Sequence, residues 1–388
     1  MVRKITILGS TGSIGKQALQ VIDQFPGRFK IVALSAKENI AELEEQARKY
    51  HPEAVALENK EKAEELSRQL RGTGIQVLSE AAGIERLASW PGSDLVLVAL
   101  VGFSGLLPTL AAIESGKNIA LANKEALVVG GELVLSAAAN KNCSIIPVDS
   151  EHSAVFQCLH AGAKQEVKRI VLTASGGPFR GWTRDEMSGV TPEQALKHPS
   201  WDMGAKITVD SATLMNKGFE VIEAHWLFGL SYDSIGVVVH PESIVHSMVE
   251  YIDGSVMAQM GLPSMMHPIQ YAFSFPHRWE STYQPLDLAG IQSLNFSNPD
   301  TDVFPCLKLA YDAGKTGGTM PTVLNAANEV AVYHFLNKQL HFADIPVLLE
   351  RVMKLHQLTA FPTLEDILSA DRWARKEAEL LLKRNFAG

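Results

Sequence analysis

The fold of this chain is decided near its start by residues 5–15, which read Ile-Thr-Ile-Leu-Gly-Ser-Thr-Gly-Ser-Ile-Gly. The first four residues predict a buried strand, and residues 16–25 continue with the apolar spacing of a helix. Glycine allows a sharp turn between the two and a close approach to a pyrophosphate, which the helix N-terminus attracts with its amides and dipole. The spacing G-x-x-G-x-x-G differs from the commoner G-x-G-x-x-G, but this placement favours dinucleotide binding over a plain turn.

Strand and helix patterns continue to alternate through the first 150 residues. Further apolar runs predict strands at residues 31–34, 54–57, 76–78, 95–100, 118–122 and 144–148. Continuous apolar strands separated by helices are typical of a parallel sheet that is covered on both faces. We therefore expect a Rossmann-like domain over residues 1–150.

The pattern changes after residue 150. Strands are expected at 235–240, 243–251 and 255–260, and Asp253-Gly254 predicts a hairpin between the last two. We expect a central α+β domain over 151–285 with a flexible lid at 176–204, a linker at 286–303, and a helical bundle over 304–388. The bundle helices are expected at 305–313, 321–337, 343–355 and 363–384. The expected fold class is α/β, with these two regions following the N-terminal parallel sheet.

Length and composition exclude several classes of protein. The 388 residues are enough for two to three domains, and 35 basic against 43 acidic residues give a net charge of −8. This balance argues against general binding to nucleic acid or to an anionic membrane. Three scattered cysteines are too few for a disulfide framework and fit a reducing compartment. We therefore expect a cytoplasmic protein that binds neither nucleic acid nor membrane.

The end of the second expected strand bears on the choice of nicotinamide cofactor. An acidic residue at this point binds the ribose hydroxyls of NAD, whereas a cation suits the 2′-phosphate of NADP. The sequence here is Lys37-Glu38-Asn39. Lys37 favours NADP and Glu38 argues for NAD, while a solvated loop lysine explains the sequence equally well.

Two polar motifs follow later strands of the expected sheet. Asn123-Lys124-Glu125 comes after one strand and Asp149-Ser150-Glu151 after another. The carboxyl ends of such strands face the ligand crevice. If residues 149–151 are extended, both carboxylates project to one side and suit Mg²⁺ or Mn²⁺. A surface ion pair and a helix cap remain open as alternatives.

A second group of polar residues lies in the central region. We expect a helix over 212–228, capped by Ser211, that places Asn216 and Glu220 at i and i+4. This face could bind phosphate through Ser211, Asn216 and Lys217 while Glu220 reaches a metal, although an ordinary solvated face is the alternative. Ser175-Gly-Gly could expose successive amides to an anion.

Each motif is modest alone, but their order along the chain is informative. The motifs are Gly-Ser-Thr-Gly-Ser-Ile-Gly at 9–15, Leu-Ala-Asn-Lys-Glu at 121–125, Pro-Val-Asp-Ser-Glu-His at 147–152, Ser-Gly-Gly-Pro-Phe at 175–179, His-Pro-Ser-Trp at 198–201, Val-Asp-Ser-Ala-Thr-Leu-Met-Asn-Lys-Gly at 209–218 and Leu-Asn-Ala-Ala-Asn-Glu at 324–329. Together they closely resemble the 1-deoxy-D-xylulose 5-phosphate reductoisomerase family over essentially the whole chain.

The resemblance implies an activity and a set of ligands. It implies conversion of 1-deoxy-D-xylulose 5-phosphate, a phosphorylated sugar, into 2-C-methyl-D-erythritol 4-phosphate on the non-mevalonate route to isoprenoids. It also implies NADPH, a divalent cation (Mn²⁺, Mg²⁺ or Co²⁺) and a homodimer. One departure concerns the cofactor: the family usually has Gly-Lys-Asn or similar where this chain has Lys37-Glu38-Asn39.

The resemblance also assigns residues by motif. The implied metal ligands and catalytic carboxylates are Asp149, Glu151 and Glu220, with Lys124 as a further catalytic residue. Substrate contacts are implied for Lys124, Ser150, Glu151, Ser175, His198, Ser211, Asn216, Lys217 and Glu220. Cofactor contacts are implied for Thr11, Gly12, Ser13, Ile14, Asn39, Asn123, Glu125 and Gly204, and the charge at the end of the second expected strand adds Lys37 as a further expected contact.

Two other functions remain open on the residues alone. One is a metal-independent NADP dehydrogenase that acts on a phosphorylated sugar or semialdehyde. The other is a non-catalytic dinucleotide sensor that binds a partner through its C-terminal helices. Loss of activity on metal removal would distinguish the expected enzyme from the metal-independent dehydrogenase. Any turnover at all would distinguish it from the non-catalytic sensor.

Overall fold

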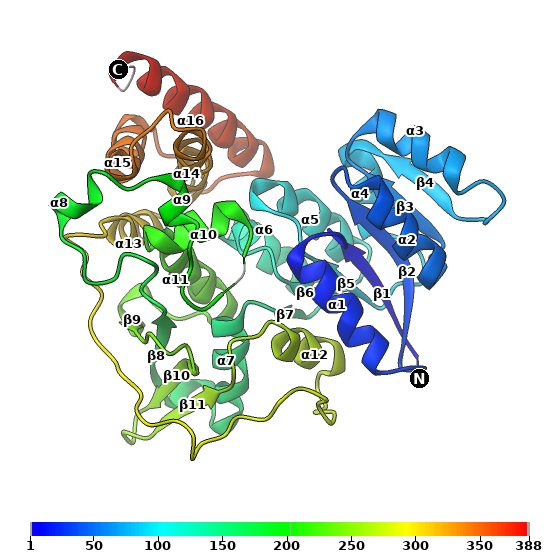
Figure 1. The fold of residues 1–388 in the computed structure, drawn as a ribbon, viewed down its shortest axis with the longest axis horizontal. Helices are drawn as coiled ribbons and strands as arrows, with labels where there is room; N and C mark the ends of the chain where they lie inside the picture. Colours follow the sequence, from blue (N-terminus) through cyan, green and yellow to red (C-terminus); the bar gives the residue numbers. More distant parts are fainter. Residues whose placement is uncertain (1, 202, 386–388) are drawn as a thin grey trace. The chain divides into compact units, whose positions relative to one another are not determined.

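The computed structural model describes residues 2–201 and 203–385 (Figure 1). The chain divides into two compact units, each assembled from several segments. The first unit comprises Met1–Ala126, Val134–Ser153 and Ser264–Gln284. The second comprises Leu127–Leu133, Ala154–Pro263 and Pro285–Gly388. Among the described residues, no helix has both the length and the apolar character needed to cross a membrane.

The first unit is built on a seven-stranded parallel sheet in the order β4-β3-β2-β1-β5-β6-β7. Its strands are β1 (Arg3–Leu8), β2 (Phe29–Ala36), β3 (Ala54–Leu57), β4 (Gln76–Ser79), β5 (Leu95–Val98), β6 (Asn118–Leu121) and β7 (Ile145–Pro147). The order reverses beside β1, whose neighbours are β2 and β5. Such a reversal opens a crevice at the carboxyl ends of the strands, where ligands bind. The expected Rossmann-like sheet is confirmed.

Helices between these strands complete the first unit (Figure 1). They are α1 (Ser13–Gln24), α2 (Ile40–Tyr50), α3 (Lys60–Gln69), α4 (Glu80–Ala88), α5 (Leu106–Glu114), α6 (Glu125–Lys141, except Leu127–Leu133, which are grouped with the second unit) and the first turn of α7 (Ser150–Cys158). The inner face of α1 is buried as its apolar spacing predicts, through Ala18, Leu19, Val21 and Ile22. Strands β3 and β5 are buried along their whole length, as expected for a sheet covered on both faces.

One helix from later in the chain also belongs to the first unit. Helix α12 (Met266–Ser274) packs against α1, and Phe273 lies 5.7 Å from Phe29, centroid to centroid. The Arg3 Nη1 atom donates a hydrogen bond of 2.6 Å to the Phe273 carbonyl. Residues 264–284 are therefore grouped with the parallel sheet, whereas the sequence analysis expected them in the central domain.

The second unit contains a four-stranded sheet in the order β11-β10-β8-β9. Its strands are β8 (Val167–Ala174), β9 (Ile235–Val239), β10 (Val245–Tyr251) and β11 (Val256–Met260). Strands β8 and β9 are parallel, and β10 is antiparallel to both of its neighbours. The Asp253-Gly254 hairpin is confirmed, with Gly254 at a φ of 86°. The analysis of the sequence did not identify β8, whose first half is largely exposed.

The remaining helices belong to the second unit. They are α8 (Arg184–Met187), α9 (Pro192–Ala195), α10 (Ala205–Ala212), α11 (Met215–Phe228), α13 (Cys306–Thr316), α14 (Met320–Leu336), α15 (Ile345–Leu355) and α16 (Leu364–Asn385). The last four match the expected C-terminal helices closely. They share a unit with the second sheet because α13 packs tightly on α11: a Cβ on Gly218 would lie 2.4 Å from the Cβ of Ala310.

The segments expected as lid and linker contain little regular structure. The expected lid at 176–204 includes the short helices α8 and α9, and its residue Asp202 lies outside the described residues. The expected linker at 286–303 makes one bridge to the second sheet, between Ser297 and Val239.

The prediction of a helix over 212–228 is wrong at its first residues. The chain breaks after Ala212, because Leu214 adopts a φ of 61°, and α11 begins only at Met215. Ser211 therefore lies in the last turn of α10 and is not the cap of α11. A bulky residue in the left-handed region costs about 1–2 kcal/mol, so the surrounding packing must enforce this break.

Candidate active site

The glycine-rich turn after β1 is shaped by steric need at two positions. Gly9 has a φ of 87°, and a Cβ there would lie 2.5 Å from the Ala99 carbonyl oxygen. A Cβ on Gly15 would lie 2.3 Å from the carbonyl oxygen of Gly9. Gly12 is the N-cap of α1 and has no side chain to cap the first-turn amides. The turn therefore presents these amides and the positive end of the helix dipole to an anion.

The turn after β2 holds its polar and charged residues in different ways. Asn39 caps α2, where its side chain accepts a hydrogen bond of 3.3 Å from the Glu42 amide. The Glu38 carboxylate pairs with Lys62 Nζ at 3.1 Å. Lys37 is exposed to solvent. The acidic residue that argued for NAD is thus held by a lysine of α3.

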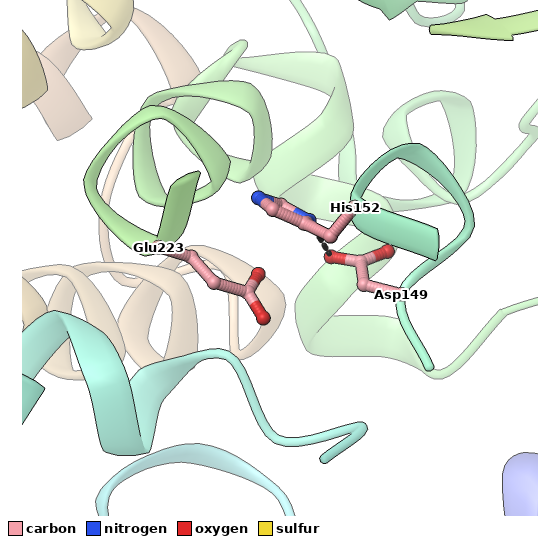
Figure 2. A group of neighbouring side chains, drawn as sticks. All are labelled: Asp149, His152 and Glu223. Carbon is pink, nitrogen blue, oxygen red and sulfur yellow. Dashed lines mark ion pairs between the residues drawn. The ribbon is translucent and has the colours of Figure 1, made fainter. Parts of the chain in front are cut away.

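A buried ion pair lies at the carboxyl ends of β6 and β7. These strands are parallel neighbours, so Lys124 and Asp149 emerge at the same edge of the sheet. Lys124 Nζ lies 2.7 Å from Asp149 Oδ2, and the two side chains are only 6% and 13% exposed. The buried His152 places Nδ1 3.5 Å from the same oxygen (Figure 2). Burial is the largest influence on Asp149 and raises its pKa, but Lys124 and His152 together outweigh it and hold that pKa well below its usual range.

Residues 149–151 are not extended, contrary to the expectation from the sequence. Helix α7 begins at Ser150, so Glu151 lies in the first helical turn. The two carboxylates nonetheless converge, since an oxygen of Asp149 lies within 4.8 Å of an oxygen of Glu151. Ser150 Oγ donates a hydrogen bond of 2.7 Å to Glu151 Oε2. The strand-to-helix turn, rather than strand pleating, brings the carboxylates together.

Asn123 has an architectural part in this edge of the sheet. Its side-chain nitrogen donates to the carbonyls of Leu100 and Gly102, at 3.0 and 2.9 Å, and also contacts Glu125 Oε2 at 3.0 Å. Its Oδ1 atom accepts from the Ala126 amide at 3.1 Å, at the start of α6. The Asn123 side chain therefore ties the turn after β5 to the start of α6.

In the second unit, one histidine joins two serines from separate segments. His198 Nε2 lies 3.0 Å from Ser175 Oγ, just after β8, and 3.1 Å from Ser211 Oγ in α10. His198 Nδ1 accepts hydrogen bonds from the amides of Ser200 and Trp201, at 3.2 and 3.0 Å. Since Nδ1 accepts, this pattern assigns the proton of a neutral ring to Nε2. Burial also lowers the pKa of His198, which favours the neutral form.

A third polar group lies on α11. Asn216 Nδ2 donates a hydrogen bond of 2.5 Å to Glu220 Oε1, and Lys217 Nζ forms an ion pair with Glu220 Oε2. Lys217 and Glu220 are both buried, so this face of the helix is not the solvated surface considered as an alternative. Glu223, one turn further along α11, is fully buried as well (Figure 2). Gly204, which is exposed, is the N-cap of α10.

The structure therefore gathers the expected residues into local groups. Lys124, Asp149, Ser150 and Glu151 meet in the first unit, together with His152, whose role the sequence analysis missed. The signal was available, since His152 follows Asp149 by three residues at a helix start. The second unit holds two groups, namely Ser175 with His198 and Ser211, and Asn216 with Lys217 and Glu220.

Comparison with known families gives one consistent result. Residues 5–131 match the family described as 1-deoxy-D-xylulose 5-phosphate reductoisomerase. Residues 145–228 match the C-terminal domain of 1-deoxy-D-xylulose 5-phosphate reductoisomerase, and residues 260–377 match a domain described as the DXP reductoisomerase C-terminal domain. These segments include every motif singled out from the sequence.

Individual relatives agree with the family match. The chain is 54% identical over 385 residues to the 1-deoxy-D-xylulose 5-phosphate reductoisomerase of Pelotomaculum thermopropionicum, covering 99% of this chain and 100% of the relative. The enzyme of the same name from Synechococcus sp. is 54% identical over 384 residues, with 98% and 97% covered. The Zymomonas mobilis enzyme in complex with NADPH has a TM-score of 0.92 at 40% identity, covering 99% and 100% of the two chains. A DOX-P reductoisomerase in complex with NADPH, fosmidomycin and magnesium has a TM-score of 0.93 at 40% identity, covering 98% of each chain.

Proposed function

This chain belongs to the 1-deoxy-D-xylulose 5-phosphate reductoisomerase family, and we propose that it performs the reaction with the residues described above. It converts 1-deoxy-D-xylulose 5-phosphate into 2-C-methyl-D-erythritol 4-phosphate, with NADPH and a divalent cation. The observation that carries the assignment of residues is the buried Lys124–Asp149 pair at the crevice edge of the nucleotide-binding sheet. A metal-independent dehydrogenase does not need the two neighbouring carboxylates of Asp149 and Glu151, so that alternative is not favoured.

NADPH is proposed to bind along the carboxyl edge of the parallel sheet. The uncapped N-terminus of α1 suits its pyrophosphate, and the exposed cation Lys37 suits a 2′-phosphate. The proposed cofactor contacts are Thr11, Gly12, Ser13, Ile14, Lys37, Asn39, Asn123, Glu125 and Gly204.

The carboxylates fit a hard divalent cation. Oxygen donors are the ligands that Mg²⁺ and Mn²⁺ prefer, and Asp149 is held ionised by its neighbours despite burial. We assign Asp149, Glu151 and Glu220 as the ligands. When bound, the cation polarises the neighbouring carbonyl and hydroxyl oxygens of the substrate, and NADPH supplies the hydride. Glu220 is now paired with Lys217, so ligation by Glu220 requires that pair to loosen.

The substrate phosphate is assigned to the second unit. His198 donates through Nε2 to the serine oxygens, so the hydroxyl hydrogens of Ser175 and Ser211 remain available to an anion. The amide of Asn216 and the ammonium of Lys217 add a donor and a charge. A dianionic phosphate is remote from the reacting carbons, and its binding free energy can be used to order the site.

The chain's own residues then perform three tasks. The Lys124 ammonium lies beside Asp149 and stabilises negative charge that develops on substrate oxygens, with Ser150 as a further hydrogen-bond partner. His198 orients the two serines. The proposed lid at 176–204 excludes water during hydride transfer, because a dry site prevents side reactions of the bound substrate and strengthens electrostatic contacts.

The test is the loss of NADPH absorbance when 1-deoxy-D-xylulose 5-phosphate is added, with Mg²⁺ or Mn²⁺ and again after EDTA treatment. We expect oxidation that depends on both substrate and metal and that is much slower with NADH. Activity that survives EDTA would instead support the metal-independent dehydrogenase. Cofactor binding without any turnover would support the dinucleotide sensor.

Assembly and location form a further part of the proposal. We propose a homodimer, because β11 is an edge strand of the second sheet and exposes Val256 (53%) and Met257 (40%), which offers pairing groups and apolar contact. Light scattering should give twice the chain mass.

We also propose a cytoplasmic location, since Cys143, Cys158 and Cys306 are all free thiols. Cell fractionation tests this.

The division of labour between regions is also a proposal. We propose that residues 1–150 bind NADPH, that 151–285 hold the catalytic and dimerisation elements although 264–284 are grouped with the parallel sheet, and that 304–388 form a helical bundle behind a linker at 286–303. The parallel sheet, the second sheet and the four C-terminal helices support this division.

A further inference from the structure

The Leu-Asn-Ala-Ala-Asn-Glu stretch at residues 324–329 has no part in the proposed chemistry, yet it forms a buried polar turn of α14. Asn325 and Asn328 are both fully buried. Their side-chain amides donate to partners on different helices. Asn325 Nδ2 donates to Glu329 Oε1 on the same helix at 3.0 Å, whereas Asn328 Nδ2 donates to Asp210 Oδ1 on α10 at 2.8 Å. Through Asn328, the motif is bonded to a second helix.

Asp210 is held from two directions. Lys206, one turn earlier on α10, places Nζ 2.8 Å from Asp210 Oδ2, and Asn328 bonds the other oxygen. The Asp210 side chain is almost completely buried. Hydrogen bonds to a charged group are strong, and low local polarity strengthens them further. The bond from Asn328 therefore fixes how α10 is placed against α14.

The α14 side of this contact is itself anchored. Glu329 accepts a hydrogen bond of 2.7 Å from Arg375 on α16, and Arg375 also pairs with Asp371 at 2.8 Å. Burial, the largest influence on Arg375, lowers its pKa, but the two carboxylates outweigh it and hold that pKa above its usual range. The position of α14, and with it that of Asn328, is therefore fixed by α16.

The last turn of α10 has little freedom to move without disturbing the serine pair. Ser211 follows Asp210 directly and lies 3.1 Å from His198 Nε2. The Ser-Gly-Gly loop packs on the same turn, since a Cβ on Gly177 would lie 2.9 Å from the Ser211 carbonyl oxygen. A small shift of α10 would therefore change both the Ser211–His198 contact and the position of Gly177.

We propose that Asn328 is a positioning residue for substrate binding. Its hydrogen bond to Asp210 fixes the position of α10. In that position Ser211, His198 and Gly177 keep the spacing that the substrate phosphate requires. The C-terminal helices thus have a direct part in forming the phosphate site. The proposal rests on the proposed function, because it requires Ser211 to bind the substrate.

The first test is Asn328→Ala in the full-length, metal-loaded enzyme. We expect the KM for 1-deoxy-D-xylulose 5-phosphate to rise about tenfold, because a hydrogen bond to a charged group is lost beside the binding residue. The kcat and the dissociation constant of NADPH, followed by its fluorescence, should change by less than about twofold, since uniform substrate binding is what weakens. An unchanged KM in the folded variant would overturn the proposal.

Asn325→Ala is the matched control. Asn325 is as buried as Asn328 and lies on the same helix, but its side chain bonds within that helix. We expect a lower unfolding temperature, comparable to that of Asn328→Ala, with the KM within about twofold of the parent. If Asn325→Ala raises the KM as much as Asn328→Ala, general packing of α14 explains the effect and the positioning role is wrong.

An exchanged pair keeps the test informative if Asn328→Ala does not fold. Asp210→Asn combined with Asn328→Asp retains one amide and one carboxylate, and so can restore the bond between α10 and α14. We expect a KM within about threefold of the parent. The exchange also removes the Lys206–Asp210 ion pair, so Asp210→Asn alone is its reference. A folded exchange variant whose KM is as high as that of Asp210→Asn alone would contradict the proposal.

Ser211→Ala separates this inference from the proposed function. If Ser211→Ala raises the KM and Asn328→Ala does not, the inference fails and the phosphate site stands. If Ser211→Ala leaves the KM unchanged, Ser211 does not bind the substrate, and the inference fails together with that part of the proposed site.

Discussion

The two buried lysine–carboxylate pairs of this protein are built in different ways. In the first unit, Lys124 and Asp149 leave the ends of neighbouring strands and meet at 2.7 Å. In the second unit, Lys217 and Glu220 are three residues apart on one helix, and Asn216 bonds the same carboxylate. One pair depends on the assembled sheet, whereas the other is formed by a single helix.

This difference determines which groups face each carboxylate. Burial works against the charge of Asp149, and the ammonium of Lys124 is the main group that compensates, followed by His152. Glu220 has a neutral amide donor as well as the lysine, both from its own helix. We therefore expect the first pair to be the more sensitive to loss of its lysine.

The largest effect is expected for Lys124→Met. Methionine keeps the length of the side chain but removes the charge, so Asp149 becomes a buried carboxylate with much weaker compensation. We expect the turnover to fall about 10³-fold, within the range for a catalytic charged or proton-transfer group. The free energy of unfolding should fall by about 3 kcal/mol or more, as for a broken buried pair. Steady-state NADPH oxidation and thermal unfolding measure both.

The double variant Lys124→Met with Asp149→Asn is the control for that result. It removes both charges, so stability should recover while activity stays low. If stability does not recover, the loss in the single variant comes from packing and not from the uncompensated carboxylate.

Glu220→Gln tests whether the second carboxylate serves a metal. An amide is a weaker ligand for a hard cation, so the Mg²⁺ concentration for half-maximal activity should rise about tenfold or more, with lower turnover. Asp149→Asn should act in the same direction if both carboxylates bind one cation. Unchanged metal dependence would remove Glu220 from the ligand set and leave the two pairs unrelated in function.

Lys217→Met should have a smaller effect than Lys124→Met. Glu220 keeps its bond from Asn216, so the unfolding temperature should fall less than in Lys124→Met. The KM for the substrate should rise about tenfold, as for loss of one charged hydrogen bond to phosphate. A loss of stability equal to that of Lys124→Met would show that the local helix bond does not protect Glu220.

A pH series examines His198, which links the serines without any charged partner in the described contacts. Its pKa is lowered from 6.5 by burial, so the folded protein binds this proton less tightly than the unfolded chain. Protonation therefore favours unfolding, and stability should fall as the pH decreases below about 6.5. The KM should also rise over that window, by about threefold, because a protonated Nδ1 cannot accept from Ser200 and Trp201.

His198→Gln removes this titration. Its KM should be higher than that of the parent at neutral pH and nearly constant as the pH falls. If the parent and the variant show the same pH profile for KM, another group is responsible.

The smallest effect is expected for the exposed pair Glu38–Lys62. The Glu38 side chain is 65% exposed, and surface ion pairs contribute about 1 kcal/mol or less. Glu38→Gln should change the NADPH dissociation constant by about twofold or less, and Lys62→Met by a similar amount. Equilibrium titration with NADPH and NADH tests this. A larger effect on NADPH than on NADH would assign the pair a role in choosing the cofactor.

Much of the fold follows from local patterns. The parallel sheet, the glycine turn, the Asp253-Gly254 hairpin and the C-terminal helices were all predicted, because each depends on short-range periodicity or on turn chemistry. Strand β8 was missed, since its exposed first half lacks the signal of a buried strand. The break at Leu214 was also missed, because a bulky residue with positive φ has no local signature and is imposed by packing.

The candidate site divides in the same way. The sequence alone determined which residue types were available and which pairs lie on one helix, such as Asn216 with Glu220, because helical spacing fixes such neighbours. The motifs also identified the family, whose name the comparisons support.

The tertiary structure decided the contacts between distant segments. It brought Lys124 and His152 to Asp149, His198 to two serines, and Asn328 to Asp210. These contacts depend on which strands become neighbours and which helices pack together. Local sequence carries little of that information, because burial and packing of the whole unit select the arrangement.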